Sequence, residues 1–118
     1  MEWYIAKIVF QIICGNGDHT PQFDEQLRLV AAVDKQEAFS KATHTGKKEE
    51  ETFYNRKEQL VQWQFINVSE LYRLGELIDG AELFSHIEEK DNAAQYIRII
   101  NEKAESILSS SHQILQLA

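Results

Sequence analysis

The segment MEWYIAKIVF, residues 1–10, decides the fold, because its apolar residues recur with a period of two. One face of an extended chain running on through residue 14 is wholly apolar: Tyr4, Ala6, Ile8, Phe10, Ile12 and Cys14. The opposite face is mixed, with Trp3, Ile5, Val9 and Ile13 beside Lys7 and Gln11. Alternation with one wholly apolar face predicts a half-buried β-strand that opens the fold.

The same segment lacks the features of a secretion signal or a membrane anchor. Lys7 and Gln11 interrupt the apolar residues, and no small-residue cleavage site follows. No stretch approaches the roughly 20 apolar residues of a membrane span. The lone cysteine, Cys14, has no intrachain disulfide partner. We therefore expect a cytoplasmic protein in a reducing compartment.

The composition describes an acidic globular chain of 118 residues with a net charge of −7. A chain of this length is expected to form a single domain over residues 1–118 that buries its own core. The acidic balance disfavours nucleic acid and anionic membranes as partners, since both bind clustered Lys and Arg. It leaves a basic protein partner open, although solubility alone also explains the charge.

Outward from the first strand, the sequence predicts a hairpin and a helix. The loop CGNGDHTPQ, residues 14–22, leads into FDEQLRLVAAV, residues 23–33, which alternates as a second strand. The period then changes over residues 34–55, where Asp34 and Glu37 have capping-box spacing for a helix. Gly46 either ends this helix or lets it pack closely on the sheet.

The second half of the chain repeats this order of elements. LVQWQFINVSELYRL, residues 60–74, is predicted as a strand with a bend or bulge at Asn67 and Ser69. A turn at 75–80 precedes a short strand, AELFSHIEE, at 81–89, and a helix capped by Asp91 or Asn92 follows. The expected fold is α+β: a largely antiparallel sheet of four to five strands, in the order strand-strand-helix-strand-strand-helix, with both helices on one face.

Four short segments resemble a known family. They are WYIAK at 3–7, LRLVAA at 27–32, EAFSKA at 37–42 and WQFINV at 63–68. Together they make residues 3–87 similar to small bacterial proteins grouped as domain of unknown function 4288. The resemblance implies a bacterial origin and no activity, so no catalytic residue transfers to this chain. The helix and tail at 91–118 lie outside it.

Two groups of residues carry side chains that could support chemistry. Cys14 with nearby Asp18 and His19 could form a nucleophile pair, but Cys14 falls on the apolar strand face, where thiols act as small hydrophobes. His86 with Glu88, Glu89 and Asp91 could bind a metal only if the chain folded back on itself. We therefore expect no catalytic residue, no metal site and no cofactor.

Five aromatic residues on predicted strands form a candidate pocket for a small apolar ligand: Trp3, Tyr4, Trp63, Phe65 and Tyr72. Burial in an ordinary core explains the same residues more simply.

The C-terminal helix carries more apolar residues than packing on one sheet requires. Its stripe runs from Ala93 to Leu108, while Ile99 lies off the stripe. The candidate interface residues are Ile99, Ile107, Ile114, Leu115 and Leu117. This surplus predicts a homodimer formed through a two-fold contact, or docking of another protein.

Two functions follow from the sequence. The first is a non-enzymatic protein-interaction or regulatory module that self-associates, including an acidic protein that neutralises a basic partner. The alternative is a small-ligand-binding protein or an enzyme that uses the aromatic-lined sheet face. A filled core argues for the first, and an open aromatic pocket for the second.

Overall fold

The computed structural model describes residues 1–109 and divides the chain into two compact units, residues 1–85 and 86–118. The first unit contains a four-stranded antiparallel sheet of β1 (Glu2–Cys14), β2 (Gln22–Ala32), β3 (Glu51–Tyr54) and β4 (Leu60–Arg73). Their order in the sheet is β2-β1-β4-β3. The described part of the second unit, residues 86–109, contains one helix. The predicted α+β fold is confirmed, with four strands, whereas the prediction of one domain over residues 1–118 stays a prediction.

Strands β1 (Glu2–Cys14) and β2 (Gln22–Ala32) form the long hairpin that the alternation predicts. They pair antiparallel from Glu2 opposite Ala32 to Ile12 opposite Gln22. Gly15 and Gly17 in the connecting loop have φ angles of 58° and 82°, a left-handed region that favours glycine. The two left-handed backbone positions that this loop needs are therefore both occupied by glycine.

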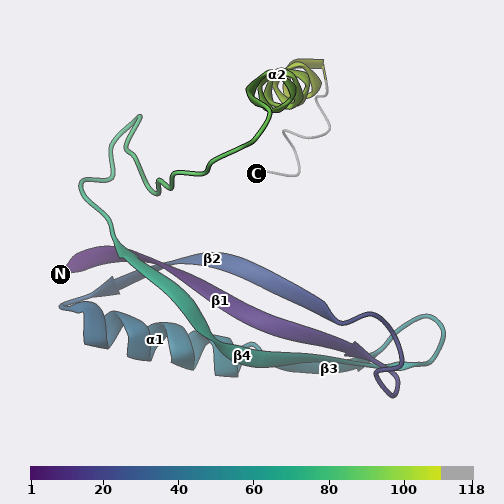
Figure 1. Cartoon of the computed structure of the whole chain (residues 1–118). Helices are drawn as coiled ribbons and strands as arrows, with labels where there is room; N and C mark the ends of the chain where they lie inside the picture. The colour runs from purple at the N-terminus through teal and green to yellow at the C-terminus, as the bar shows by residue number, and fades with distance from the viewer. Residues whose placement is uncertain (110–118) are drawn as a thin grey trace. The chain divides into compact units, whose positions relative to one another are not determined.

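Helix α1 (Lys35–Lys48) lies along one face of the sheet, as Figure 1 shows. The Asp34 side chain accepts a hydrogen bond of 2.8 Å from the Glu37 backbone N–H, which confirms the predicted cap. The helix buries Ala38, Ala42 and Gly46 against the sheet. Phe39, which follows Ala38, does not belong to this narrow face of small residues and is exposed.

The core lies between α1 and the wholly apolar face of β1. Nine buried residues form it: Tyr4, Ala6, Ile8, Phe10, Val30, Ala32, Ala38, Ala42 and Val68. Phe10 is 1% exposed and meets the Phe65 ring edge to face at 6.1 Å. The face of β1 that decides the fold is thus the face that the helix covers.

Strand β4 (Leu60–Arg73) pairs with β1 along its length and contains the irregularity predicted near Asn67 and Ser69. The register with β1 shifts twice, between Lys7 and Ile8 and between Val9 and Phe10. The shifts bring Val68 opposite Ile8 and Phe65 opposite Phe10. Val68 therefore joins the core, although strict alternation places it on the other face from Phe65.

Two predicted elements are wrong. The helix ends at Lys48 rather than continuing toward residue 55, and β3 (Glu51–Tyr54) forms instead by pairing with β4. Residues 81–89 are not a strand. Within this segment, the Phe84 ring packs on the sheet at 5.0 Å from the ring of Tyr72.

The second unit contains helix α2 (Ala93–Ser109). The Asn92 side chain accepts a hydrogen bond of 3.0 Å from the Gln95 backbone N–H, so Asn92 rather than Asp91 caps the helix. The predicted packing of this helix on the sheet stays a prediction. Across residues 1–109, no helix combines the length and the hydropathy that crossing a membrane requires.

Candidate functional site

A site with several polar side chains lies at the end of α1, on the face of the sheet that α1 covers. A groove of about 580 Å³ opens there between the helix C-terminus and strands β2, β3 and β4. Its apolar lining consists of Phe10, Phe53 and Trp63. Its carboxylates are Asp24, Glu49, Glu50 and Glu51. The only base among its lining residues is Lys48.

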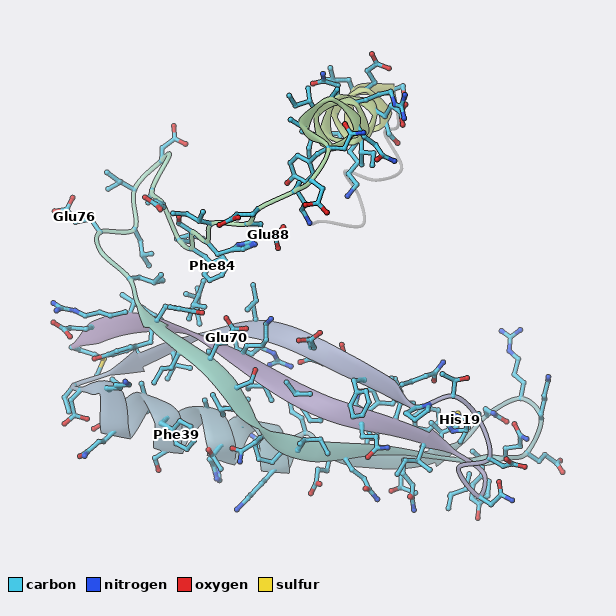
Figure 2. All side chains as sticks on the ribbon, in the orientation of Figure 1. His19, Phe39, Glu70, Glu76, Phe84 and Glu88 are labelled. Atoms are coloured by element: carbon cyan, nitrogen blue, oxygen red, sulfur yellow. The ribbon has the colours of Figure 1, made fainter. Side chains whose placement is uncertain are left out.

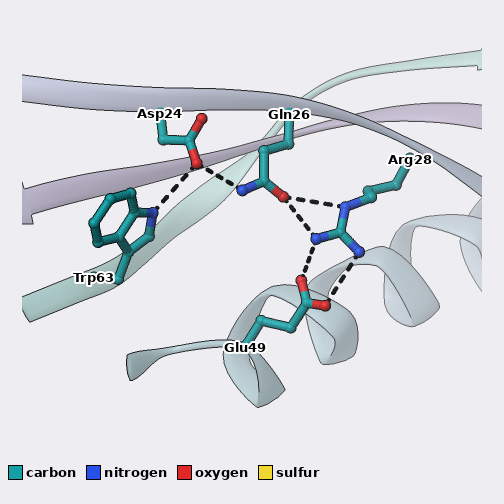
Figure 3. Close-up of polar contacts among 5 residues, drawn as sticks. All are labelled: Asp24, Gln26, Arg28, Glu49 and Trp63. Atoms are coloured by element: carbon teal, nitrogen blue, oxygen red, sulfur yellow. Dashed lines mark hydrogen bonds and ion pairs between the residues drawn. The ribbon is translucent and has the colours of Figure 1, made fainter. Parts of the chain in front are cut away.

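A ladder of polar side chains runs along β2 at the edge of this groove (Figure 3). Asp24, Gln26 and Arg28 alternate along the strand and therefore share the face that α1 covers. Gln26 donates to Asp24 at 2.6 Å and accepts from Arg28 at 2.7 Å and 3.1 Å. Arg28 in turn forms a two-armed ion pair with Glu49 at the end of α1.

The ladder also reaches the far side of the groove. The Trp63 indole N–H donates to Asp24 at 3.2 Å, which links β4 to β2 across β1. The rings of Trp63 and Phe53 stack at 6.4 Å. The Phe65 backbone N–H donates to the Glu50 carboxylate at 3.0 Å, which fixes the chain just after the helix. These contacts hold the aromatic rings and carboxylates in one place.

The electrostatics of the groove favour a cationic group. The C-terminal end of α1 carries the negative end of the helix dipole. Ring faces such as that of Trp63 attract cations. Arg28 is already held by Gln26 and Glu49, so its charge is directed at the ladder rather than into the groove. The arrangement suits recognition of an ammonium or guanidinium group and supplies no nucleophile.

Cys14 and His19 do lie together at the end of the hairpin, but not as a catalytic pair. The His19 Nε2 accepts a hydrogen bond of 3.0 Å from the Cys14 backbone N–H, and Nδ1 lies 2.8 Å from the Thr20 carbonyl. Both ring nitrogens are therefore engaged with the backbone, and neither is placed to take the thiol proton. Cys14 itself is half-buried, and its structural role stays a prediction. His19 is labelled in this loop in Figure 2.

The side chains of His86, Glu88 and Lys90 contact one another through a hydrogen bond and an ion pair. The His86 Nε2 lies 2.9 Å from the Glu88 carboxylate, whose other oxygen meets Lys90 at 3.1 Å. These partners hold the pKa of Glu88 below its usual value, the hydrogen bond from His86 contributing most. Within residues 1–109, no group of three His, Cys, Asp or Glu side chains is arranged to hold a metal ion.

The five predicted pocket aromatics lie on two faces of the sheet. Tyr4, Trp63 and Phe65 are on the face that α1 covers, where Tyr4 belongs to the core and only Trp63 lines the groove. Trp3 and Tyr72 are on the opposite face, which we call the open face. The five do not line one pocket, since neighbouring residues such as Trp3 and Tyr4 point to opposite sides of a strand.

The open face carries exposed apolar side chains beside one charged cluster. Trp3, Phe23, Leu27 and Leu29 are 44–59% exposed. Lys7 pairs there with Glu70 at 2.7 Å and with Glu25 at 3.4 Å, and Figure 2 labels Glu70 on this side of the sheet. The hydrogen bond to Glu70 raises the pKa of Lys7. The Tyr72 hydroxyl also donates a hydrogen bond to Glu70, and this bond raises the pKa of Tyr72.

Two of the five predicted interface residues fall on α2. Ile99 is 40% exposed and Ile107 is 47% exposed. The stripe residues Tyr96, Ile97, Ile100 and Leu108 are exposed as well. Ile114, Leu115 and Leu117 lie outside the described residues.

Sequence reasoning missed most of the groove. It identified Trp63 but not Asp24, Gln26, Arg28 or Glu49. The usable signal was the polar alternation at 24, 26 and 28, which places polar groups on the same strand face as Val30 and Ala32. A polar row on a core-side face predicts a hydrogen-bonded network, because buried polar groups need partners.

The comparison with protein families agrees with the fold. The family model of the domain of unknown function DUF4288 matches residues 3–85, and the chain belongs to this family. The match coincides with the first unit and excludes α2. No curated protein and no solved structure matches the chain.

Proposed function

We propose that this member of the DUF4288 family is a non-enzymatic protein-interaction module that self-associates through α2. The observation that carries the proposal is the apolar stripe of α2, whose large residues are all exposed. An isolated helix of this length is marginally stable in water, so most of its stability must come from packing of the apolar face. The second unit contains no other described element that covers it.

The open face of the sheet supports the same function. Four of its large apolar side chains are well exposed: Trp3, Phe23, Leu27 and Leu29. Scattered apolar residues on a surface are ordinary, but contiguous ones mark interaction sites. Leu29 lies opposite Ile5, and Leu27 opposite Lys7, so both flank the centre of this face. These exposed apolar side chains support a role in protein contact rather than in catalysis.

The test compares two variants of α2, each of which adds one negative charge on a different side of the helix. Ile107→Glu places a carboxylate in the stripe, whereas Gln95→Glu adds the same charge well away from it. Sedimentation velocity of the full chain should show at least a tenfold weaker association for Ile107→Glu and an unchanged one for Gln95→Glu. Equal association of both variants would contradict a role for the stripe.

A second candidate function rests on the groove. The stacked Trp63 and Phe53 rings beside Asp24 and Glu50 favour a ligand with an ammonium or guanidinium group. Titration of Trp3→Phe protein with tetramethylammonium or arginine should then change the remaining Trp63 fluorescence. Trp63→Phe protein, which keeps Trp3, is the matched control. A Trp63 signal that does not saturate with ligand would exclude this function.

A further inference from the structure

Strand β2 forms one edge of the sheet, and half of its backbone groups face away from the sheet. The Leu74 N–H donates to the Trp3 carbonyl, and the Gly15 N–H to the Leu60 carbonyl, so odd-numbered residues of β1 point their backbone toward β4. Even-numbered residues of β1 therefore point toward β2. Since Tyr4 lies opposite Val30, even-numbered residues of β2 bond to β1, and odd-numbered ones face outward.

One outward group already has a partner. The Lys41 ammonium of α1 donates to the Ala31 carbonyl at 2.7 Å. Four residues remain along the edge: Phe23, Glu25, Leu27 and Leu29. Among residues 1–109, no backbone group pairs with their outward N–H and C=O groups. An unpaired edge of this length is a template for another strand.

We propose that this edge pairs antiparallel with the β2 edge of a second copy of the chain, about a two-fold axis at Gln26. The inference rests on the proposed self-association and assigns it a contact in the first unit, separate from α2. In this register Arg28 lies opposite Asp24 of the other copy, and Leu29 opposite its Phe23. Each pairing occurs twice, because the contact is isologous. Opposite charges and large apolar side chains facing each other both stabilise strand pairs.

The register also satisfies the outward backbone groups. Phe23 meets Leu29, and Glu25 meets Leu27, as hydrogen-bonded pairs in both directions. Ala31 falls opposite Pro21, which has no N–H to donate. The Ala31 carbonyl does not need one, because Lys41 already binds it. The bonding groups of the two edges therefore match over the whole segment.

Neighbouring registers are worse for identifiable reasons. An axis at Arg28 places two arginines opposite each other, and an axis at Glu25 does the same for two glutamates. An axis at Leu27 places the Phe23 N–H of one copy opposite the Ala31 carbonyl of the other. That carbonyl already accepts a hydrogen bond from Lys41. Among the axes at residues 25 to 28, only the one at Gln26 avoids both a like-charge pair and a competition with Lys41.

The paired edges also join the two open faces. Phe23, Leu27 and Leu29 from each copy become neighbours across the axis, so their exposed side chains form one larger apolar surface. Burial of this apolar surface stabilises the contact in water, in addition to the backbone hydrogen bonds.

Cysteine cross-linking tests the register in full-length Cys14→Ala protein, which has no native thiol. At a non-hydrogen-bonded antiparallel pair the Cα atoms are about 4.5 Å apart, within disulfide range. Gln26→Cys should therefore cross-link with itself under mild oxidation. Arg28→Cys alone and Asp24→Cys alone should not, since their own copies lie about 13 Å apart along the strands. A mixture of those two should cross-link.

We expect Gln26→Cys to form dimer at least tenfold faster than Arg28→Cys alone. Self-linking of Leu27→Cys or Arg28→Cys in its place would overturn this register. A chain that self-associates in light scattering, yet links at no β2 position, would overturn the β2 contact and leave the proposed function standing. A chain that is monomeric at all concentrations would overturn both.

Discussion

Phe10 is the residue on which the core depends most. It is the largest of the fully buried side chains and meets Phe65 edge to face under the end of α1. Phe10→Ala should lower the free energy of unfolding by about 3–5 kcal/mol, through lost burial and the cavity left behind. Tyr54→Ala in β3 is the control, since Tyr54 is 72% exposed and lies in none of the proposed contacts, so its loss should cost under about 1 kcal/mol. Urea denaturation of both variants decides, and similar losses would mean that the assigned faces are wrong.

Gly46 is a helix residue where alanine should be harmful. Alanine normally stabilises a helix by about 1 kcal/mol relative to glycine. Here, however, a Cβ atom would lie 2.3 Å from the Phe65 ring. We expect Gly46→Ala to destabilise the fold by about 1–3 kcal/mol through overpacking. Thermal unfolding measures this, and Gly46→Ala combined with Phe65→Leu should recover part of the loss. A stabilised single variant would show that the helix does not approach the strand this closely.

Three residues make the fold sensitive to alkaline pH. Burial raises the pKa of Tyr4, with Glu2 adding to it, and Glu70 raises the pKa of Tyr72 and of Lys7. The ordinary values are 10.0 for tyrosine and 10.5 for lysine. A raised pKa in the folded state gives stability that is complete below the unfolded value and lost as the pH rises through the folded one. The free energy of unfolding should therefore fall above about pH 10.

Urea titrations at several pH values measure this dependence. Glu70→Gln should flatten the alkaline fall, because it removes the negative charge of the carboxylate that Lys7 and Tyr72 share. Glu58→Gln, in the β3–β4 turn, is the control, since it removes the same charge elsewhere on the chain. An alkaline fall that is identical in both variants would contradict the role given to Glu70.

At the scale of elements, the sequence predicted those whose pattern is local. The alternation of residues 2–14 predicts β1, and Asp34 with Glu37 predicts the start of α1. The polar residues Asn67 and Ser69 mark the irregular part of β4, because they break the alternation. In each case the signal lies within the element itself.

The missed elements depend on distant partners. Residues 51–54 continue the apolar spacing of the helix, but pairing with β4 makes them strand β3. Residues 81–89 have strand-like composition, yet Phe84 packs on Tyr72 instead of joining an edge. The groove shares this character, since Asp24, Trp63 and Glu49 meet only after three elements have assembled. Local pattern indicated Trp63 as an aromatic strand residue and gave no indication of its partners.

At the scale of the whole molecule, the central claim is self-association. The apolar stripe of α2, the open face and the β2 edge each present a surface that another chain can cover. The net charge of −7 opposes contact between two copies, so the contact must offset that repulsion locally. Arg28 opposite Asp24 across the β2 edge provides such a local attraction.

Multi-angle light scattering of the wild-type chain across a dilution series tests this claim most directly. The chain has a mass of 13.7 kDa. We predict a weight-average mass that approaches twice this value at high concentration and falls toward it on dilution, as a reversible two-fold dimer requires. A mass that stays at 13.7 kDa up to the highest soluble concentration would contradict the account.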